Sequence, residues 1–293
     1  MRFALIGAAG YIAPRHMKAI KDTGNELVAA IDPHDSAGVL DKFFPDCKFF
    51  TEIERFDRYL ELLKRQDKGI DYISICSPNY LHDAHVRLAL RAGSNAICEK
   101  PLVINPWNLD ALATLEQEAK KNVYTIFQLR LIPEVIQLKK KLEVELNLCH
   151  NVQLTYVTRR GPWYQTSWKG NEEKSGGIAM NIGIHFFDLL IWLFGKVKQV
   201  EVLQRFPDKM VGLLHLERAD VKWILSSNKN DLPKGCENAH RVLSVDGQEI
   251  DLSSQFTDLH TQVYKGILEG RGYKIKDARP SIQLVHDIRS KEN

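Results

Sequence analysis

The chain has 293 residues, of which 44% are hydrophobic and 26% charged, so it is too apolar to be a disordered protein. Its formal net charge is only +3 and no basic stripe with interleaved aromatic residues stands out, so nucleic acid is not predicted as a partner. The five scattered cysteines contain no C-x-x-C pair and indicate a reducing compartment, the cytoplasm. A strand begins almost at once, which leaves no room for a signal peptide. The longest apolar stretch, Phe186–Phe194, is too short to span a bilayer, so no membrane association is predicted.

The first elements predict a βαβ unit. The apolar run Phe3–Ile6 is typical of a strand buried on both faces, and a helix is predicted over Tyr11–Thr23. A second buried strand, Glu26–Ile31, ends at Asp32. Strand, helix and strand within about thirty residues are the pattern of a parallel pair joined by a crossover helix.

The alternation of strands and helices continues to about residue 127. Further helices are predicted over Phe56–Arg65, His82–Ala92 and Leu109–Lys121, and further strands over Tyr72–Cys76, Ala96–Cys98 and Tyr124–Phe127. Such alternation predicts a doubly wound parallel sheet, an α/β Rossmann domain, over residues 1–123.

The pattern changes after this point. A helix near Pro133–Leu146 is followed by strands of alternating polarity, with one helix, Asn181–Phe194, among them. The predicted strands are Val152–Thr158, Val197–Gln204, Met210–Leu216, Val221–Ser226 and Arg241–Val245. Strands without intervening helices predict a second, α+β domain with an open, mainly antiparallel sheet over residues 124–293. The tail after Ser253 is predicted as a helix, a Gly-rich turn and a polar end.

The turn between Gly7 and Ala13 is the first candidate site. Small residues let the backbone approach a pyrophosphate closely, and the following helix points free N–H groups at it. The match to G-x-G-x-x-G is imperfect because alanine stands where a glycine is expected, so a purely structural turn is the alternative. Asp32, about twenty residues on, can accept hydrogen bonds from ribose hydroxyls and would repel a 2′-phosphate. NAD is therefore favoured over NADP, unless Asp32 only starts a turn with Pro33.

Two further motifs follow later strands, where ligands of doubly wound sheets bind. The first is Ser77-Pro78-Asn79 with His82, whose residues are also ordinary turn formers. His82 and His85 lie one turn apart, but no third ligand has suitable spacing, so no metal is predicted. The second is Glu99-Lys100-Pro101. A partly desolvated Lys100 could donate hydrogen bonds and shift its pKa toward neutrality, whereas an ordinary lysine is a solvated surface charge. Pro101 could fix the Lys100 backbone through a cis bond.

The last motif runs from Gly176 to His185. In a helix, Asn181 and His185 are four residues apart and share a face. Gly177 and Gly183 remove side-chain bulk and make room for a ligand. The alternative is a core histidine bonded to Asp188.

Together these motifs resemble the Gfo/Idh/MocA family of sugar oxidoreductases, over most of the chain. The resemblance depends on the N-terminal turn, Ser77-Pro78-Asn79-x-x-His82, Glu99-Lys100-Pro101, and Gly176-Gly177 followed by Asn181, Gly183 and His185. It implies a Rossmann domain followed by an open-faced sheet domain, and it implies that Lys100 and His185 flank the reacting sugar hydroxyl. Many members have an aspartate at the position of Asn181, and an amide cannot take a proton.

Three stretches resemble more closely the bacterial 3-dehydrogenases that oxidise UDP-N-acetylglucosaminuronic acid during synthesis of O-antigen sugars. They are Gly7–His16, Cys76–His85, and Arg160–Tyr164 with Ser167–Gly170. In such enzymes an asparagine occurs at the position of Asn181. The resemblance implies a UDP-sugar substrate, 2-oxoglutarate as an oxidant of bound NADH, and a homodimer or homotetramer. The residues themselves agree, because arginine and lysine suit a diphosphate and a carboxylate, and aromatic rings suit a sugar or uracil face. A surface loop with aromatic anchors is the alternative.

The hypothesis is NAD-dependent oxidation of the C3 hydroxyl of the UDP-sugar acid, with Lys100 and His185 as catalytic residues. His185 is favoured as the base, although their roles cannot be divided from sequence. The predicted cofactor-binding residues are Gly7, Ala9, Gly10, Tyr11, Ile12, Asp32, Ser77, Asn79, His82, Glu99, Lys100 and Gln128. The predicted substrate-binding residues are Lys100, Arg160, Tyr164, Ser167, Lys169, Asn181 and His185. The alternatives are a dehydrogenase of another sugar or an inositol, and a non-catalytic NAD-binding sensor.

Overall fold

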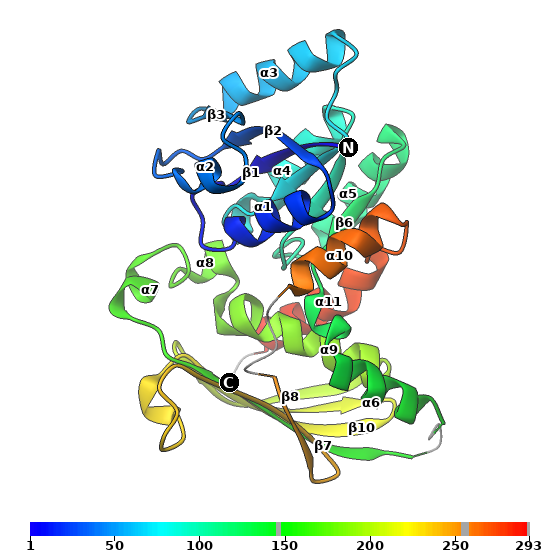
Figure 1. The fold of residues 1–293 in the computed structure, drawn as a ribbon. Helices are drawn as coiled ribbons and strands as arrows, with labels where there is room; N and C mark the ends of the chain where they lie inside the picture. The colour runs from blue at the N-terminus through cyan, green and yellow to red at the C-terminus, as the bar shows by residue number, and fades with distance from the viewer. Residues whose placement is uncertain (145–147, 253–257, 292–293) are drawn as a thin grey trace. The chain divides into compact units, whose positions relative to one another are not determined.

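The computed structural model describes residues 1–144, 148–252 and 258–291, which divide into two compact units (Figure 1). The first unit comprises Met1–Val103, Trp107–Gln128 and Asp258–Ala278. The second comprises Ile104–Pro106, Leu129–Thr257 and Arg279–Asn293. Residues 258–278 therefore group with the N-terminal unit, although they follow every strand of the second unit in sequence.

A parallel sheet forms the centre of the first unit, and in the described chain its order is β3-β2-β1-β4-β5-β6. The strands are β1 (Arg2–Ile6), β2 (Glu26–Ile31), β3 (Lys48–Phe50), β4 (Tyr72–Ile75), β5 (Asn95–Cys98) and β6 (Val123–Thr125). All neighbouring pairs are parallel, which confirms the predicted Rossmann sheet. Strand β4 is buried along its whole length, because helices cover both faces of such a sheet. This double coverage explains the continuous apolar runs in the sequence.

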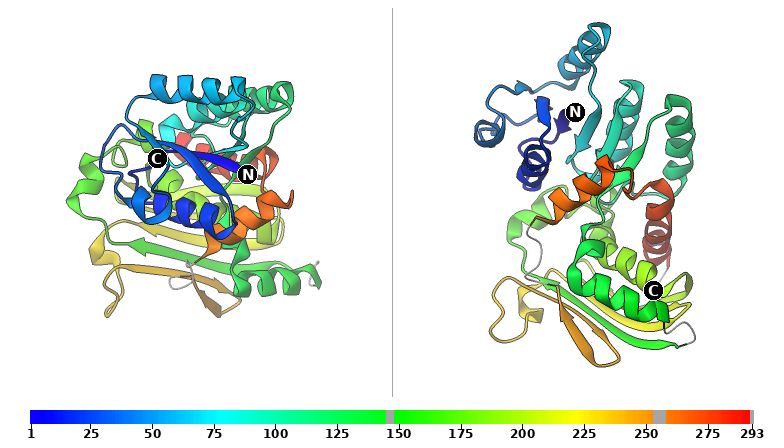
Figure 2. Two further views of the ribbon diagram at one scale, coloured as in Figure 1. Left: turned by 45° about the horizontal axis from the view of Figure 1, so that its top comes forward. Right: turned by 45° about the vertical axis from the view of Figure 1, so that its right-hand side comes forward.

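Helices lie on both faces of this sheet. They are α1 (Ala13–Asp22), α2 (Val39–Phe43), α3 (Ile53–Arg65), the short 3₁₀ turn η1 (Asn79–Leu81), α4 (His82–Arg91), α5 (Trp107–Ala119) and α10 (Leu259–Leu268). The strand order reverses after β3, and right-handed crossovers then place helices before and after the reversal on opposite faces. Helix α10, orange in Figure 2, packs beside α1, blue in the same figure.

The second unit contains a mixed sheet with the order β12-β11-β7-β10-β9-β8 among its described residues. The strands are β7 (His150–Thr158), β8 (Val197–Phe206), β9 (Lys209–Leu216), β10 (Ala219–Ser226), β11 (Ala239–Val245) and β12 (Gln248–Asp251). The β7–β10 pair is parallel and the remaining neighbours are antiparallel, which confirms the predicted, mainly antiparallel sheet. Strand β12 was not predicted, because its short, polar sequence has no hydrophobic alternation.

One face of this sheet supports helices, and the other has alternating exposed side chains such as Gln153 and Lys222. The helical segments are η2 (Gln128–Leu131), α6 (Pro133–Val144), α7 (Pro162–Thr166), α8 (Glu172–Ser175), the π-helical turn η3 (Ala179–Gly183), α9 (Ile184–Phe194), the 3₁₀ turn η4 (Lys229–Asp231) and α11 (Ile275–Ser290), whose first residues belong to the first unit. Helix α9 is fixed on the sheet by Phe187, whose ring meets the Trp223 ring edge-on at 5.3 Å between centroids.

The structure differs from the prediction in one helix and in the tail. Parts of a second predicted helix and of the tail lie outside the described residues. The α-helix α9 begins at Ile184, not at Asn181 as predicted, and Asn181 lies in the π-helical turn η3 that precedes it. The tail expected to be a polar end forms helix α11, whose inward positions, such as Ile282 and Val285, are fully buried. The last two residues of the helix predicted to end at Leu146, and the start of the tail at Ser253, lie outside the described residues.

The apolar segment around α9 is longer than the sequence analysis predicted. The helical stretch Glu172–Phe194 is long and apolar enough to cross a membrane by length and composition alone. However, 72% of its most apolar 18-residue stretch is buried inside the structure. The buried core helix of a globular protein meets the same criteria of length and composition. Its apolar character is explained by packing against the sheet, as the Phe187–Trp223 contact illustrates.

Candidate functional site

The predicted cofactor-binding residues of the first unit lie at the carboxyl ends of its strands. Gly7 follows β1, Asp32 follows β2, Ser77 follows β4, Glu99 follows β5, and Gln128 lies just beyond β6. Because the strands are parallel, these ends meet at one edge of the sheet. The order reverses between β1 and β4, and ligands of doubly wound sheets bind in the crevice at such a reversal. The sheet therefore brings together residues that are up to 121 positions apart in sequence (128 minus 7).

The turn after β1 is built for a close approach of two backbones. Gly7 has a φ of +90°, and a Cβ atom there would lie 2.7 Å from the carbonyl carbon of Cys76 and from the nitrogen of Ser77. Only glycine fits between the ends of β1 and β4. Helix α1 then begins after Ile12. The N–H groups of Ala13 and Arg15 donate to the carbonyls of Gly10 and Ile12, at 3.1 and 3.0 Å, and Pro14 has no N–H, so the helix offers an anion the positive end of its dipole. This cradle fits the pyrophosphate of a dinucleotide.

Asp32 holds this turn in place and lies at the same edge of the sheet as Gly7. Its carboxylate is 7% exposed and accepts hydrogen bonds from the backbone N–H groups of Ala9, at 3.0 Å, and His34, at 2.9 Å. Asp32 therefore organises the loop that begins with Pro33. This local role is compatible with the other interpretation, in which its carboxylate binds the ribose. Each carboxylate oxygen has a second lone pair that can accept a ribose hydroxyl.

His82 joins the loops that follow β4 and β5. Its Nδ1 lies 2.6 Å from the carbonyl oxygen of Pro101 and its Nε2 lies 2.8 Å from that of Ser77. Burial lowers the pKa of His82 and outweighs the two carbonyl contacts, which raise it, so the neutral ring is favoured. A neutral imidazole has one N–H group, so it donates to only one of the two carbonyls at a time. The neighbouring His85 accepts or donates a 2.8 Å hydrogen bond with the Ser77 hydroxyl, and burial lowers its pKa to about 4. The pair thus stiffens the predicted cofactor loop.

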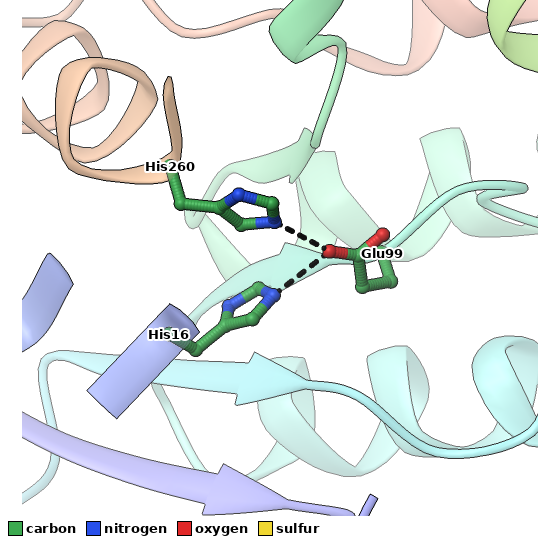
Figure 3. A group of neighbouring side chains, drawn as sticks. All are labelled: His16, Glu99 and His260. Carbon is green, nitrogen blue, oxygen red and sulfur yellow. Dashed lines mark hydrogen bonds and ion pairs between the residues drawn. The ribbon is translucent and has the colours of Figure 1, made fainter. Parts of the chain in front are cut away.

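Glu99 lies in a buried cluster that the sequence analysis missed. One carboxylate oxygen meets His16 at 2.9 Å and His260 at 3.0 Å, and the other accepts the backbone N–H of Lys100 at 3.3 Å (Figure 3). The Lys100–Pro101 peptide bond is cis, as predicted. A signal for His16 was present, because it lies on the apolar face of α1 with the buried Ala13 and Ile20.

In the second unit, Asn181 lies in the π-helical turn η3 and His185 in the first turn of α9. The Asn181 amide donates a 2.6 Å hydrogen bond to the hydroxyl of Tyr164, which is buried. Burial raises the pKa of Tyr164, so the phenol stays protonated. π-helical turns recur at functional sites. Tyr164 and Asn181, predicted separately as substrate-binding residues, are therefore direct neighbours.

The segment 159–170 brings cations and aromatic rings together, as its composition predicted. The Arg160 guanidinium lies 5.6 Å from the centre of the Tyr164 ring, and the Lys169 ammonium lies 5.0 Å from that of Trp163. Burial lowers the pKa of Lys169, and Arg160 lowers it further. The Ser167 hydroxyl donates to the backbone carbonyl of Tyr164 at 3.0 Å and so supports the loop itself.

A cavity of about 300 Å³ opens beside this segment. Its polar lining includes predicted residues, Tyr164 and Lys169, and also Arg205 and Arg289, which the sequence analysis did not single out. Glu172 also lines the cavity, and its carboxylate pairs with Arg289 at 3.6 Å. Three cationic side chains against one carboxylate leave a net positive charge, which favours an anionic ligand. The two arginines come from β8 and α11, and no sequence motif links elements so far apart.

Asp188, considered as a partner for a core histidine, binds Arg130 through both carboxylate oxygens. The Arg130 guanidinium donates to them at 2.9 and 2.6 Å, and both side chains are buried. The pair joins η2 to α9, the helix that bears His185. Its contribution is positional, since a two-bonded guanidinium fixes the rotation of the helix that it holds.

The strand order, the glycine turn and Asp32 are typical of a dinucleotide-binding domain. The family model for the NAD-binding Rossmann fold of the Gfo/Idh/MocA oxidoreductases matches residues 1–127. The model for the C-terminal alpha/beta domain of the same family matches residues 147–230. The chain belongs to the Gfo/Idh/MocA oxidoreductase family, which confirms the predicted resemblance.

Among solved structures, the chain is similar to the WlbA (WbpB) dehydrogenase of Thermus thermophilus. The identity is 48%, and the match covers 100% of this chain. The complex with NAD and alpha-ketoglutarate has a TM-score of 0.97 with 96% of its chain covered, and the complex with NAD and UDP-GlcNAcA has 0.96 with 95% covered.

Curated relatives are more distant. The uncharacterised oxidoreductase YgjR of Escherichia coli is 28% identical, with 69% of this chain and 60% of the relative covered. The inositol 2-dehydrogenase of Rhizobium meliloti is 26% identical, with 72% of this chain and 61% of the relative covered. The matched part of the chain thus spans about three fifths of the length of these relatives.

Proposed function

We propose that the protein oxidises the C3 hydroxyl of UDP-N-acetylglucosaminuronate with NAD⁺, as a step in O-antigen sugar synthesis. The observation that carries the proposal is the full-length likeness, at 48% identity, to a dehydrogenase solved with NAD and UDP-GlcNAcA. The chain's own residues support it, because one unit has a dinucleotide cradle and the other has cationic and aromatic side chains around a cavity.

When bound, NAD⁺ supplies the hydride acceptor. The Gly7 turn and the N-terminus of α1 hold the pyrophosphate, and Asp32 accepts hydrogen bonds from the adenosine ribose. In the reaction, His185 takes the hydroxyl proton while Lys100 donates a hydrogen bond to the hydroxyl oxygen. A general base of this kind contributes about 10²–10⁴-fold to the rate. Asn181 cannot accept a proton, so it binds and orients the sugar, with its amide fixed by Tyr164.

The cationic cavity of the second unit is proposed to accept anionic groups of the nucleotide sugar. Lys169 and Arg205 offer positive charge, as does Arg289, which also pairs with Glu172. The Tyr164 ring in the lining and the Trp163 ring beside Lys169 offer faces for a sugar or base. The likeness to a dehydrogenase solved with alpha-ketoglutarate supports 2-oxoglutarate as the oxidant of NADH in this protein too. A cytoplasmic location and a homodimer or homotetramer, with the exposed sheet face as the contact, stay predictions.

A panel of UDP-sugars, inositols and free sugars tests the substrate. We expect NADH formation, followed by absorbance, with UDP-N-acetylglucosaminuronate and none with myo-inositol. If 2-oxoglutarate re-oxidises the cofactor, its addition restores turnover after the first NADH has formed. Turnover of an inositol or a free sugar alone would contradict the proposed substrate. Tight NAD⁺ binding without turnover of any sugar would instead favour a sensor.

Replacing Asp32 by asparagine should shift the cofactor preference toward NADP⁺. Asparagine can still accept the His34 N–H but no longer repels a 2′-phosphate, so the ratio of kcat/KM for NADP⁺ to that for NAD⁺ should rise about 10-fold, which is about 1.4 kcal/mol. The measurement is initial rates with both cofactors. Asp57→Asn, at an exposed site on α3, is the matched control. An unchanged ratio in Asp32→Asn would remove Asp32 from the ribose site.

A further inference from the structure

The cluster around Glu99 joins three distant parts of the first unit. Glu99 follows β5, His16 lies on α1, and His260 lies on α10 from the C-terminal segment. Both histidine Nε2 atoms point at the same Glu99 oxygen, Oε1, as Figure 3 shows. All three side chains are buried. A carboxylate in this setting is stable only if hydrogen-bond donors replace the water it has lost.

The cluster continues beyond the two histidines. His16 Nδ1 lies 2.7 Å from the hydroxyl of Tyr264, and that hydroxyl lies 2.6 Å from the Ser74 hydroxyl on β4. One arrangement of protons satisfies every contact: Ser74 donates to Tyr264, Tyr264 to His16, and His16 to Glu99. Each group then has the partner it needs, and a fully satisfied buried network specifies one geometry.

The charge of the cluster follows from its surroundings. Burial alone raises the pKa of Glu99, but hydrogen bonds from His16 and His260 outweigh it and hold the pKa well below its usual range. Burial lowers the pKa of His16 despite the carboxylate beside it, so His16 is a neutral donor. Burial raises the pKa of the Tyr264 hydroxyl and of the Cys76 and Cys98 thiols near Glu99, so these groups stay neutral. Burial also lowers the pKa of His82, which favours its neutral ring.

Helix α10 is anchored so that His260 reaches this point. The Tyr264 ring stacks on Phe3 of β1 at 6.0 Å between centroids, and the Thr261 hydroxyl donates to Asp22 of α1 at 3.2 Å. Lys18 of α1 pairs with Asp258 at the start of α10, at 2.9 Å. Contacts along the first half of the helix therefore fix His260 against the end of β5.

The second carboxylate oxygen of Glu99 links the cluster to Lys100. Glu99 Oε2 accepts the backbone N–H of Lys100 at 3.3 Å. A carboxylate held at one oxygen by two imidazoles cannot rotate, so its other oxygen holds the Lys100 backbone in one place. We infer that His16 and His260 are positioning residues of the reaction, which act through Glu99 to fix Lys100 at the end of β5. The inference rests on the proposed function, in which Lys100 contacts the substrate.

Two histidines and a glutamate could also hold a metal ion, since their ligand atoms lie within 4.8 Å of one another. The contacts favour hydrogen bonds instead, because 2.9 and 3.0 Å are ordinary N–H···O lengths. The described residues also supply only three ligands, whereas a closed structural zinc site has four. Metal content of the purified protein is therefore one arm of the test.

The test compares His260→Ala, His260→Gln and Tyr264→Phe with the wild type in kcat, KM, pH dependence and melting temperature. His260→Ala should lower kcat on the order of 10- to 100-fold, the loss expected when a reacting group is misplaced by a fraction of an ångström to about 1 Å. Gln retains a side-chain N–H donor, so His260→Gln should recover part of that loss. Tyr264→Phe keeps the ring and removes the hydroxyl that fixes His16, and it should give a smaller loss.

The pH dependence separates positioning from simple stabilisation. A carboxylate with a lowered pKa stays ionised as the pH falls, until the pH reaches that pKa. Loss of the His260 donor raises the pKa of Glu99. The acid limb of kcat, which also contains the titration of the proposed base His185, should therefore gain a step at higher pH in His260→Ala and a smaller one in His260→Gln. His215→Ala removes a half-exposed histidine that pairs with Asp220 at 2.5 Å, and it should leave both kcat and the limb unchanged.

Several results would overturn the inference. Wild-type kcat and an unmoved acid limb in His260→Ala, even with a lower melting temperature, would reduce the cluster to a structural role. If that variant does not fold, the same result in His260→Gln and Tyr264→Phe decides against positioning. Stoichiometric zinc in the wild type that is lost in His260→Gln would make the cluster a metal site. A wild type inactive on UDP-N-acetylglucosaminuronate refutes the proposed function, whereas active variants beside an active wild type refute only this inference.

Discussion

Replacement of Lys100 by alanine should lower kcat by about 10²–10⁴-fold while NAD⁺ still binds. Lys100 follows β5 directly, and its backbone is fixed by Glu99 and by the cis bond to Pro101. The pyrophosphate cradle lies instead at the end of β1 and the start of α1, so it does not depend on the Lys100 side chain. Steady-state rates and a calorimetric titration with NAD⁺ measure the two effects separately.

Lys68→Ala is the matched control, because this lysine is exposed in the loop before β4. It should leave both kcat and the NAD⁺ affinity at wild-type values. Near-normal turnover in Lys100→Ala would show that another group polarises the hydroxyl. A parallel His185→Ala variant assigns the base, because loss of the base removes the dependence of kcat on the pH range in which that base titrates.

The second large effect is expected at Gly7. In Gly7→Ala the new Cβ would lie 2.7 Å from two backbone atoms of the Cys76–Ser77 segment, at a φ of +90°. Left-handed backbone costs about 1–2 kcal/mol and overpacking about 1–3 kcal/mol, so the free energy of unfolding should fall by roughly 2–5 kcal/mol. The ends of β1 and β4 must separate, which opens the cradle, so NAD⁺ affinity should fall by at least about 100-fold. Urea unfolding and calorimetry measure the two losses.

Gly24→Ala separates the conformational cost from the steric one. Gly24 also has a positive φ, +71°, but no atom lies within 4 Å of its Cβ position. This variant should lose only about 1–2 kcal/mol and bind NAD⁺ normally. Equal losses of stability and NAD⁺ affinity in the two variants would mean that the contact between Gly7 and the end of β4 does not shape the cofactor site.

Much of the fold could be predicted because its signals are local. Continuous apolar runs such as Phe3–Ile6 and alternating ones such as Val221–Ser226 distinguish strands buried on two faces from strands buried on one. The strand ends of a parallel sheet share one edge, so the order of motifs along the chain also predicted that Gly7, Asp32, Ser77 and Glu99 would gather there. Strand β12 was missed because its sequence is short and polar. Helix α11 was missed because polar residues separate its apolar positions, such as Ile282 and Val285, which packing buries.

The site residues that sequence reasoning missed form contacts over long distances in the chain. Arg130 binds Asp188 over 58 residues, and His260 binds Glu99 over 161. Each looks locally like an ordinary charged or core residue, because no spacing rule connects the two partners. The π-helical turn that holds Asn181 has no signature of its own, since its residues also fit an α-helix.

The sequence by itself determined the NAD-binding βαβ unit, the glycine at position 7 and the lysine that follows β5. These depend on backbone geometry and on the strand-helix alternation, both of which are written in neighbouring residues. Only the tertiary structure decided that α10, after every strand of the second sheet, returns to the first unit and completes the surroundings of Glu99. The physical reason is that a buried carboxylate needs donors from whichever helix covers it, and which helix that is depends on the packing of the whole unit.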